Sequence, residues 1–505
     1  MSHADSNLLI RADASASIGT GHVMRCLALA QAWQDRGWRV AFAMAQSTPS
    51  VEQRLLANRC EVLSVDAEPG TLQDANRAAH FAAEQHASWV VADGYQFGAE
   101  YQERLKAAGL QVLVLEDYGH SGRYTADLVL DQNVCADGAL YEKRSAFTKL
   151  LLGPRYCLLR REFVAMKTWG RRIPEQAQHL LVSMGGSDPQ SLTARVIESL
   201  SLVEIEGLHV KVVAGGSNPQ YKSLRVLAEE SSRKAIKMEV QPDVTNMAKL
   251  MAWADVAIAA AGSTCWELCM LGLPALLLDA AGHQIPLARE LARLECAVYA
   301  GSSSEMTAAK VAHELDTLVR SAGLRQTLSQ NCRRLVDGAG ARRVVSAMIG
   351  GLRLRRAGKE DVQLLWNWAN DADVRSNSFA SEPIPWDTHV EWLRQKLAQP
   401  DCMLFIAEDS PGNSVGQIRL DGNSNGEMYV NLSLSKERRG QGLAAALIDR
   451  GVDQAFADGN CRQIHALVKP GNAASLRAFE CAGFTRVGIE QIRGTEAVHL
   501  ILNRL

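Results

Sequence analysis

The segment Arg11-Ala-Asp-Ala-Ser-Ala-Ser-Ile-Gly-Thr-Gly-His22 decides the fold of the N-terminal part of this chain. It follows a short apolar run at 7–11 and leads into a stretch with apolar residues at helical spacing from Val23 to Trp33, which Gly37 ends. The order of strand, glycine turn and helix predicts a βαβ unit with the helix N-terminus at the carboxyl edge of a parallel sheet. Glycines at such a turn let backbone N–H groups face an anionic ligand.

The same alternation of apolar runs and helical patterns continues for about 350 residues, in two series. The expected strands are 7–11, 39–43, 89–92, 112–115 and 128–130, followed by 179–183, 210–214, 238–240, 256–259 and 275–278. Several of these strands end in a polar side chain, as at Asp93, Asp117 and Asp131, at the edge where ligands of open α/β sheets bind. We therefore expect two doubly wound domains that face each other across a cleft, the GT-B type of architecture. Gly185-Gly186 and Gly215-Gly216 fit either an internal repeat or a single α/β period.

A histidine stands in the first turn after the first strand. His22 lies close in sequence to Asp13, and histidine is the side chain best suited to accept a proton from water near neutral pH. A structural histidine at a helix N-terminus fits the spacing equally well. Asp13, Asp93 and Asp117 are candidates to orient His22 or to bind sugar hydroxyls, and the sequence does not decide between these roles.

A second ligand-binding turn is expected after the strand at 256–259. Gly262-Ser263-Thr264 leads into a helix, which makes an anion cradle suited to a diphosphate. Glu267 then has two interpretations, an acceptor for ribose hydroxyls or a capping glutamate. Cys265 and Cys269, four residues apart, are expected in the core rather than on a metal. The Gly185-Gly186 turn either forms the floor of the cleft or permits tight packing.

A third pattern begins near residue 351. A strand at 352–356 and a helix around Trp366 precede expected antiparallel strands at 403–408, 414–420 and 427–434. A basic glycine turn and a helix follow, then a strand at 463–468 and a last helix from Asn472. Successive N–H groups of the turn suit a pyrophosphate, and arginines add positive charge. The turn is Arg438-Arg439-Gly440-Gln441-Gly442-Leu443-Ala444.

The bulk composition sets limits on the domains and partners. A chain of 505 residues predicts two or three domains, here 1–168, 169–350 and 351–505. The net charge of −2 excludes the basic stripe that nucleic acids require. Eleven Cys without a CxxC pair, and an N-terminus without a leader pattern, indicate a cytoplasmic protein. The apolar stretch 256–280 is too interrupted for a membrane span, and no cluster has metal-site spacing, so no metal is expected.

Residues 8 to about 345 resemble the UDP-sugar hydrolases of pseudaminic acid biosynthesis, a route to flagellin glycosylation. The resemblance rests on the Arg11–His22 run, Asp93-Gly94-Tyr95, Glu116-Asp117, Asn133, Gly153 to Phe163, Met184 to Asp188, and Gly262 to Glu267. It implies that His22 is the catalytic base, and Asp13 is the carboxylate expected beside it in the catalytic set. It further implies a set of substrate-binding residues: Arg11, Gly19, Gly21, Asp93, Tyr95, Asp117, Asn133, Arg160, Gly185, Gly186, Gly262, Ser263, Thr264 and Glu267. Trp266 departs from the family, in which Asn can occupy that position.

Residues 352–505 resemble the GCN5-related (GNAT) N-acetyltransferases, in the branch that acts on amino sugars. The resemblance implies acetyl-CoA as co-substrate, bound by Arg438, Arg439, Gly440, Gln441, Gly442, Leu443, Ala444, Asn472 and Ser475. Glu427 or His465 is the expected base, although each also fits an ordinary strand-end residue. Phe479 stands where the family usually has the tyrosine that protonates the thiolate, so the general acid stays open among Ser475, Tyr429 and water.

Together the two resemblances imply a GT-B-like pair of domains followed by a GNAT domain, with consecutive activities on one UDP-amino-sugar. The GNAT domain would acetylate its 4-amino group. The first two domains would then hydrolyse UDP-2,4-diacetamido-2,4,6-trideoxy-β-L-altropyranose to UDP and free sugar. Fusion would raise the effective concentration of the intermediate. The alternatives are a glycosyltransferase with a GT-B fold fused to another amino-sugar acetyltransferase, and a UDP-sugar sensor with a degenerate GNAT domain. The oligomeric state is left open.

Overall fold

A computed structural model of the chain contains two compact units, Met1–Ala341 and Arg342–Leu505, and each is described by itself. The residues that the structure describes are 7–186, 188, 190–203, 205–215, 218, 220–232, 236–242, 244–302, 306–349, 352–409, 412–423, 425–457 and 461–503. The expected domain boundary at 350/351 lies outside the described residues. The expected boundary at 168/169 falls between the two sheets of the first unit.

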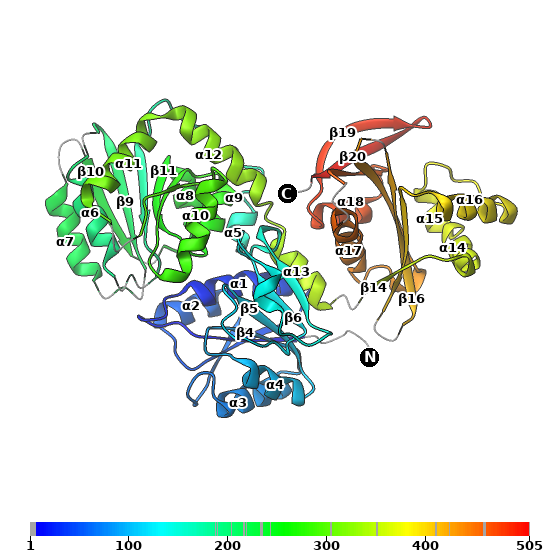
Figure 1. The fold of residues 1–505 in the computed structure, drawn as a ribbon, viewed down its shortest axis with the longest axis horizontal. Coiled ribbons are helices and arrows are strands. Elements are labelled where there is room, and N and C mark those ends of the chain that lie inside the picture. The colour runs from blue at the N-terminus through cyan, green and yellow to red at the C-terminus, as the bar shows by residue number, and fades with distance from the viewer. Residues whose placement is uncertain are drawn as a thin grey trace. The chain divides into compact units, whose positions relative to one another are not determined.

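The first sheet of the first unit is wholly parallel, in the order β3-β2-β1-β4-β5-β6-β7. Its strands are β1 (Asn7–Ala12), β2 (Val40–Met44), β3 (Glu61–Ser64), β4 (Ala87–Asp93), β5 (Gln111–Glu116), β6 (Leu128–Asp131) and β7 (Lys149–Leu152). Its helices are α1 (Gly21–Gln34), α2 (Pro49–Ala57), α3 (Leu72–Glu84), α4 (Ala99–Ala107), and the short 3₁₀ turns η1 (Gly138–Tyr141) and η2 (Pro154–Tyr156). Leu9 and Val90 pack with Ala78 of α3 and Leu105 of α4 on one face of the sheet. Figure 1 shows α3 and α4 beside this sheet.

The second sheet is also parallel, in the order β10-β9-β8-β11-β12-β13. Its strands are β8 (His179–Ser183), β9 (Leu208–Ala214), β10 (Ile236–Pro242), β11 (Val256–Ala260), β12 (Ala275–Leu278) and β13 (Val298–Tyr299). The helices of this part are α5 (Arg161–Val164), α6 (Leu192–Leu200), α7 (Tyr221–Ser231), α8 (Met247–Trp253), α9 (Thr264–Leu271), α10 (Ile285–Arg293), α11 (Ala308–Arg320), α12 (Ala322–Leu335), and the 3₁₀ turn η3 (Gly282–Gln284). α13 (Gly340–Ile349) follows them across the boundary of the units.

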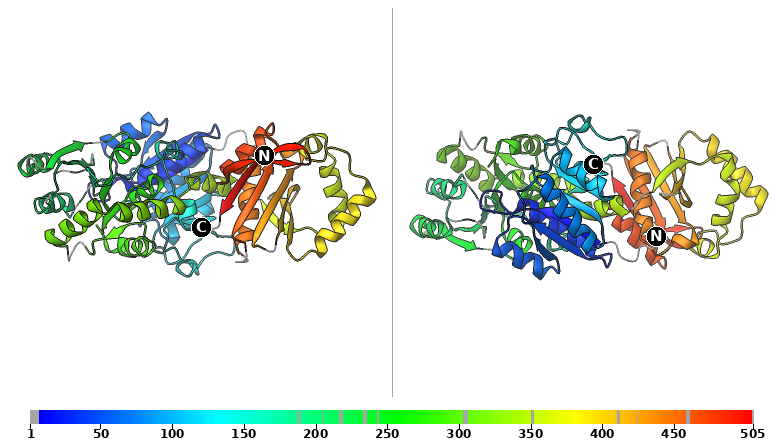
Figure 2. Two further views of the ribbon diagram at one scale, coloured as in Figure 1. Left: turned by 90° about the horizontal axis from the view of Figure 1, so that it is seen from above. Right: turned by 90° about the horizontal axis from the view of Figure 1, so that it is seen from below.

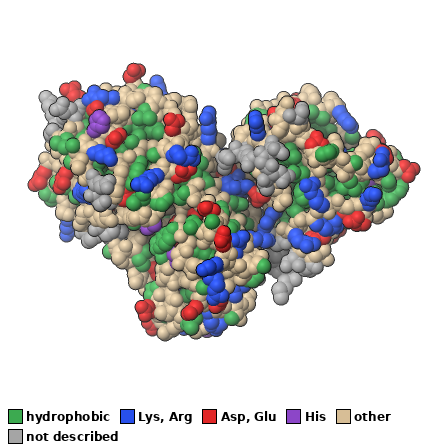
Figure 3. Space-filling view, viewed as in Figure 1, with side chains coloured by type: hydrophobic (Ala, Val, Ile, Leu, Met, Phe, Trp, Pro, Cys, Tyr) green, Lys and Arg blue, Asp and Glu red, His purple; other side chains and the backbone are tan. Residues whose placement is uncertain are grey.

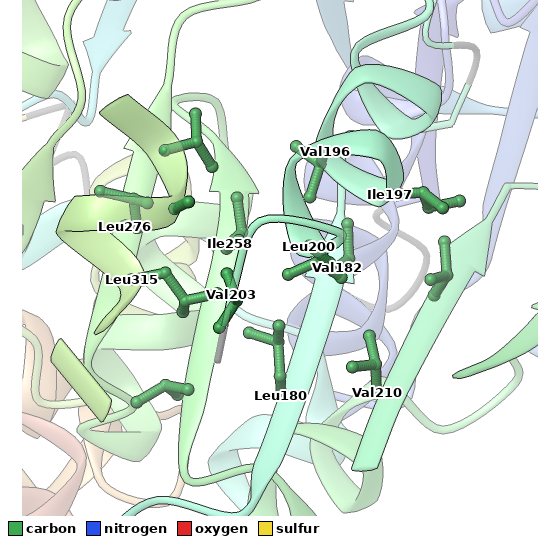
Figure 4. Close-up of a cluster of buried hydrophobic side chains, with 14 of the residues drawn as sticks. Leu180, Val182, Val196, Ile197, Leu200, Val203, Val210, Ile258, Leu276 and Leu315 are labelled. Carbon is green, nitrogen blue, oxygen red and sulfur yellow. The ribbon is translucent and has the colours of Figure 1, made fainter. Parts of the chain in front are cut away.

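Alternate residues of the second sheet build two separate cores. Leu180 and Val182 point to the face covered by α6, α7 and α11 (Figure 4), whereas Leu181 between them packs against α8, α9 and α10. Because both faces are buried, the strands are continuous apolar runs rather than alternating ones. The sheet is therefore doubly wound, as the sequence predicts.

Both sheets change direction at an equivalent point. In the first sheet the chain moves outward from β1 to β3 and returns to β4 beside β1; in the second it moves from β8 to β10 and returns to β11 beside β8. The carboxyl ends of the strands on either side of such a switch point leave a crevice, where open α/β sheets bind ligands. His22 follows β1 and Asp93 ends β4 at the switch point of the first sheet, and Gly185 and Gly262 follow the switch-point strands of the second.

The second unit holds a mixed sheet in the order β14-β15-β16-β17-β18-β20-β19, antiparallel except between β17 and β18. Its strands are β14 (Arg353–Arg356), β15 (Cys402–Glu408), β16 (Ser414–Gly422), β17 (Glu427–Leu434), β18 (Gln463–Val468), β19 (Thr485–Ile492) and β20 (Thr495–Asn503). Its helices are α14 (Val362–Ala369), α15 (Ala372–Asn377), α16 (Trp386–Ala398), α17 (Leu443–Ala457), α18 (Ala473–Cys481), and the 3₁₀ turns η4 (Lys359–Asp361) and η5 (Lys436–Arg438). α17 and α18 pack on one face, and α14 and α16 on the other (Figures 1 and 2).

Several strands lie outside the sequence expectation. β3, β7 and β13 are edge or near-edge strands of the first unit, and β19 and β20 follow α18, where the sequence predicted the last element. β3 and β13 have no buried residue, and β19 is exposed over most of its length. β3, β13 and β19 lack the buried apolar run on which the sequence interpretation depends, whereas β7 and β20 have apolar runs that it passed over.

The surface is of mixed charge. On the face drawn in Figure 3, Lys and Arg side chains of each unit lie among Asp and Glu side chains rather than in one band. Among the described residues, no helix combines the length and the apolar character that a bilayer crossing requires.

Leu276 tests the core of the second sheet. It is fully buried between β11 and α11, so Leu276→Ala removes contacts on all sides and should lower the free energy of unfolding by about 2–5 kcal/mol. Leu276→Met keeps the volume and should cost less than about 1.5 kcal/mol. Differential scanning calorimetry of the full chain measures both. Equal midpoints for Leu276→Ala and the wild type would contradict the buried position.

Candidate active sites

His22 and Asp93 meet at the switch point of the first sheet. The Nδ1 atom of His22, in the first turn of α1, lies 2.6 Å from Oδ1 of Asp93, at the end of β4. The carboxylate accepts a hydrogen bond from the Nδ1–H group. In a neutral His22 ring the Nε2 atom is then unprotonated and can accept a proton. Of the three carboxylates that the sequence offered, Asp93 is the one that contacts His22.

Arg25, one helical turn after His22, holds Asp93 in its ionised form. Its guanidinium donates to both oxygens of Asp93 at 2.7 Å and to both oxygens of Asp117 at 2.9 and 3.1 Å. Burial alone would raise the pKa of Asp93, but Arg25 and then His22 outweigh it and hold the pKa well below its ordinary value. Asp117 has a lowered pKa for the same reason, with Arg25 again opposing burial. Sequence reasoning missed Arg25, although its i+3 spacing from His22 on a helix places both on one face.

Arg11 and Asp13 belong to a neighbouring buried cluster. Arg11 is paired with Asp13 at 2.7 Å and with Asp74 at 2.9 Å, and Asp13 also accepts the backbone N–H groups of Ala45 and Gln46. Burial would lower the pKa of Arg11, but the bonds to Asp74 and Asp13 raise it instead. Asp13 lines the cavity described below, while its hydrogen bonds hold the strand ends of the sheet together.

Glycine turns of both halves line one cavity of about 930 Å³. A Cβ atom on Gly21 would lie 3.6 Å from the Ser263 hydroxyl oxygen, and one on Gly186 would overlap the Thr20 side chain. The turns of the two sheets therefore approach each other closely across the cavity. The residues predicted for substrate binding that line it are Gly19, Gly21, Asp93, Tyr95, Asp117, Asn133, Arg160, Gly185, Gly186, Gly262, Ser263, Thr264 and Glu267, together with His22 and Asp13. Arg11 is not part of the lining.

Glu267 and Arg160 form an ion pair at the cavity wall. Arg160 Nη2 lies 2.8 Å from Glu267 Oε1, so the Glu267 carboxylate is directed to Arg160. Burial raises the pKa of Glu267, and Arg160 offsets part of that rise. The adjacent turn places Ser263 as N-cap of α9, and Gly262 leaves the helix N-terminus open to an anion.

An aromatic cluster lines the same cavity. Tyr95 donates its hydroxyl to Asp117 at 3.0 Å and contacts the rings of His22 and Tyr118. His283, from the segment after β12, packs against Tyr95 and Tyr118. Burial lowers the pKa of His283. The sequence interpretation did not include His283 or Tyr118, for which the only signal was a position shortly after a strand.

The basic glycine turn of the second unit has the geometry of an anion site. Gly440 and Gly442 both have φ of 74°, a left-handed conformation that suits glycine, and α17 begins at Leu443. The two predicted phosphate arginines are engaged in ion pairs. Arg438 pairs with Asp409 at 2.5 Å, and Arg439 pairs with Asp371 at 2.8 Å and Asp373 at 2.9 Å. These pairs lie at the surface and are partly exposed, and ion pairs that water reaches are individually weak, so an entering pyrophosphate competes with them at small cost.

The central strands of the second unit separate. The parallel pairing of β17 and β18 covers 427–429 and 463–465, and beyond it 430–434 and 466–468 continue without pairing to each other. A strand separation of this kind frees backbone N–H and C=O groups for a ligand. The gap opens toward the turn at Gly440 and Gly442, because both lie at the carboxyl end of β17.

The two candidate bases lie on the face of the sheet opposite α17 and α18. Met428, Val430 and Leu432 of β17 pack toward these helices, which turns Glu427 and Tyr429 to the other face. His465, opposite Tyr429, stacks on its ring with 4.8 Å between centroids. Phe479 is buried against Phe484 in the core. Asn472 caps α18 through the N–H of Ser475, so its amide oxygen is already engaged.

Comparisons with known proteins bear on both units. Residues 180–337 match the glycosyltransferase family 28 C-terminal domain, and residues 351–485 match the acetyltransferase (GNAT) domain. The chain is 22% identical over 503 residues to an uncharacterised protein of Methanocaldococcus jannaschii, which covers 95% of this chain and 96% of that protein. It is 29% identical over 206 residues to the spore coat polysaccharide biosynthesis protein SpsG of Bacillus subtilis, covering 40% of this chain and 58% of that protein. It is 24% identical over 143 residues to the spermidine N(1)-acetyltransferase of Vibrio cholerae, covering 27% and 80%.

The matches confirm the predicted fold class. The chain combines GT-B-like α/β domains with a GNAT acetyltransferase fold. The GNAT match supports an acyltransferase, and the family 28 match supports a transferase or a related enzyme that handles nucleotide sugars. Within the described residues, no group of three His, Cys, Asp or Glu side chains is arranged to hold a metal ion.

Asp131 gives the first unit a pH-dependent stability. Burial raises its pKa to about 7 despite bonds from the Asn133 N–H and the Tyr141 hydroxyl. Because an unfolded aspartate ionises near pH 4, its contribution is fully present below about pH 4 and is lost as the pH rises through 7. Between pH 5.5 and 8.5 the melting midpoint of the wild type should therefore fall more than that of Asp131→Asn. Asp66→Asn, the matched change at an exposed carboxylate, should show the same fall in melting midpoint between these pH values as the wild type. Equal falls in all three proteins would contradict the assignment.

Proposed function

We propose that the chain is a bifunctional nucleotide-sugar enzyme of pseudaminic acid biosynthesis. The first unit hydrolyses UDP-2,4-diacetamido-2,4,6-trideoxy-β-L-altropyranose to UDP and free sugar. The second unit uses acetyl-CoA to acetylate the 4-amino group of the UDP-4-amino-sugar that precedes it. The observation that carries the first activity is the His22–Asp93 contact of 2.6 Å at the wall of a cavity that both switch points line.

His22 is the proposed general base. Asp93 accepts a hydrogen bond from the Nδ1–H group of His22. The Nε2 atom of His22 takes a proton from the water that attacks the anomeric carbon. The C1–O bond to UDP breaks as the new C1–O bond forms, and the imidazolium is stabilised by the ionised Asp93. Arg25 keeps that carboxylate ionised and in place. Asp117, Tyr95 and Asn133 form one hydrogen-bonded group that offers polar contacts to the sugar.

The departing UDP is proposed to bind the second sheet. The turn at Gly262, Ser263 and Thr264 presents backbone N–H groups at the N-terminus of α9, where the helix dipole favours negative charge. Glu267 is the proposed acceptor for ribose hydroxyls, with Arg160 fixing its position at 2.8 Å. The diphosphate is therefore stabilised without a metal.

The proposed acetyl-CoA site fits the residues of the second unit. The pyrophosphate would bind the N–H groups of the turn from Arg439 to Ala444, and the extended arm would pair with the freed backbone of β17 and β18. The thioester carbonyl would then lie near the point where the strands rejoin, beside Tyr429 and His465. The match to the acetyltransferase (GNAT) domain supports the same placement.

His22→Asn tests the hydrolase. The substitution removes the general base, so release of UDP should fall by about 10²- to 10⁴-fold while the affinity for UDP stays within about threefold. Proton NMR of the protein with the acetylated UDP-sugar, without any acceptor, follows the anomeric signals of the freed sugar. His80→Asn, at an exposed histidine of α3, is the matched control and should keep wild-type turnover.

Two outcomes would redirect the first proposal. Near-normal turnover by His22→Asn would remove His22 from the base role. Sugar transfer that begins only when an acceptor is added would replace hydrolysis by glycosyl transfer.

Gly440→Ala tests the acetyl-CoA turn. A side chain at a φ of 74° is strained, so the backbone N–H groups leave the phosphate positions and the KM for acetyl-CoA should rise roughly tenfold. Free thiol released from acetyl-CoA with a UDP-4-amino-sugar measures the rate. Gly494→Ala, at a φ of 75° in the β19–β20 hairpin, applies the same strain elsewhere and should leave this KM unchanged. Absence of thiol release by the wild type would exclude the acetyltransferase activity.

A further inference from the structure

A chain of four ionisable side chains crosses four strands of the mixed sheet of the second unit, on the face opposite α17 and α18. Glu427 of β17, His465 of β18, His499 of β20 and Glu490 of β19 follow one another in that order. The contacts are 3.9 Å from Glu427 Oε2 to His465 Nε2, 2.9 Å from His465 Nδ1 to His499 Nε2, and 2.6 Å from His499 Nδ1 to Glu490 Oε1. Sequence reasoning proposed Glu427 and His465 as alternatives and included neither His499 nor Glu490.

The short contact at the outer end fixes the protons of His499. Glu490 is about half exposed, and a solvated carboxylate accepts hydrogen bonds only. A distance of 2.6 Å to Nδ1 requires a proton between the two atoms, and His499 supplies it. In a neutral His499 ring the Nε2 atom is then an acceptor.

The contact between the two imidazole rings then determines which nitrogen of His465 carries the proton. Because His499 Nε2 accepts, the proton between the rings belongs to Nδ1 of His465, 2.9 Å away. The Nε2 atom of His465 is left with a free lone pair. That atom is buried and has no hydrogen-bond partner within the described part of the chain, and Glu427 at 3.9 Å is beyond hydrogen-bond distance. The reverse order would place two acceptors, His499 Nδ1 and the Glu490 carboxylate, 2.6 Å apart.

We infer that Nε2 of His465 is the base that deprotonates the substrate amine, and that His499 and Glu490 are positioning residues that set its tautomer. The inference deepens the acetyltransferase activity proposed above and rests on it. His465 ends the paired part of β18, where the gap between β17 and β18 begins, and stacks on Tyr429. Glu427 is then a carboxylate that attracts the ammonium form of the amine to Nε2.

The protons and bonds balance in this scheme. The substrate ammonium gives one proton to His465 Nε2, and the neutral amine attacks the thioester carbonyl. As the C–N bond forms and the C–S bond breaks, the nitrogen loses a second proton and the departing thiolate takes one up. After the product leaves, Nε2 of His465 gives its proton to solvent, and the starting tautomer, with Nδ1 still donating to Nε2 of His499, is restored. One proton is released for each acetyl group transferred.

The charges around His465 favour a neutral ring. Burial and then His499 lower its pKa, while Glu427 and Glu490 oppose the change. The groups that face His465 are Glu427 and Tyr429 from β17, His499 from β20 and, through His499, Glu490 from β19. A lowered pKa extends the neutral form of the ring toward lower pH, which favours Nε2 as a base at neutral pH.

The tautomer is directly measurable in the full chain without substrate. ¹⁵N-histidine labelling gives signals from twelve histidines, and those of residues 465 and 499 are assigned by comparison with His465→Gln and His499→Phe. We expect a protonated Nδ1 and an unprotonated Nε2 at both positions. In His499→Phe, residue 465 loses its acceptor and should become a mixture of tautomers. A protonated Nε2 at position 465 in the wild type would overturn the inference.

Kinetics provide the second test. His499→Phe should lower kcat/KM for the amine by about tenfold or more at pH 7 and leave the KM for acetyl-CoA unchanged. The loss in kcat/KM should become smaller as the pH rises, because solvent then deprotonates the amine. Glu490→Gln should shift the profile in the same direction by a smaller amount. Glu496→Gln, on the same hairpin and exposed, is the matched control for loss of one negative charge.

The failures of the two proposals are distinguishable. A wild type that releases no thiol with any UDP-4-amino-sugar defeats the proposed activity, even if the tautomers are as expected. An active wild type whose pH profile is unchanged in both His499→Phe and Glu490→Gln defeats the positioning role of His499 and Glu490 alone.

Discussion

The ion pair between Arg25 and Asp93 is the contact on which the first active site depends. Asp93 is fully buried, and an isolated carboxylate there would be neutral rather than charged. The bidentate guanidinium, held by α1, keeps it ionised and leaves its Oδ1 atom available to His22. Without that charge the imidazole would have no fixed tautomer and no partner for its protonated form. Strand, helix and catalytic group are thus linked through one carboxylate.

The two parallel sheets share the same switch in strand order, which explains why so many of the predicted residues line one cavity. In each sheet the loops after the two switch-point strands leave in opposite directions, which opens a crevice between them. The first sheet supplies a proton acceptor there, and the second supplies glycine turns and a helix N-terminus. A base on one side and an anion site on the other suit a reaction in which a diphosphate departs as water attacks.

In both units a carboxylate orients an imidazole, but through different contacts. In the first, a buried carboxylate kept ionised by an arginine orients one imidazole directly. In the second, the half-exposed Glu490 carboxylate accepts a hydrogen bond from Nδ1 of His499, and His499 in turn orients His465. A carboxylate can be placed near solvent when a second imidazole bridges the distance, which avoids the cost of burying a charge.

The sequence by itself determined the order of elements, the fold class and the ligand turns, because apolar periodicity and glycine placement are local properties. His22, the turn at Gly262 and the turn at Gly440 were all readable in this way. It could not select Asp93 over Asp13, reveal that Glu267 pairs with Arg160, or include His499 and Glu490. Those pairings join residues from different elements, and β19, which carries Glu490, is exposed over most of its length and has no buried apolar run to mark it. Which side chains meet is set by strand register and order, which only the tertiary structure decides.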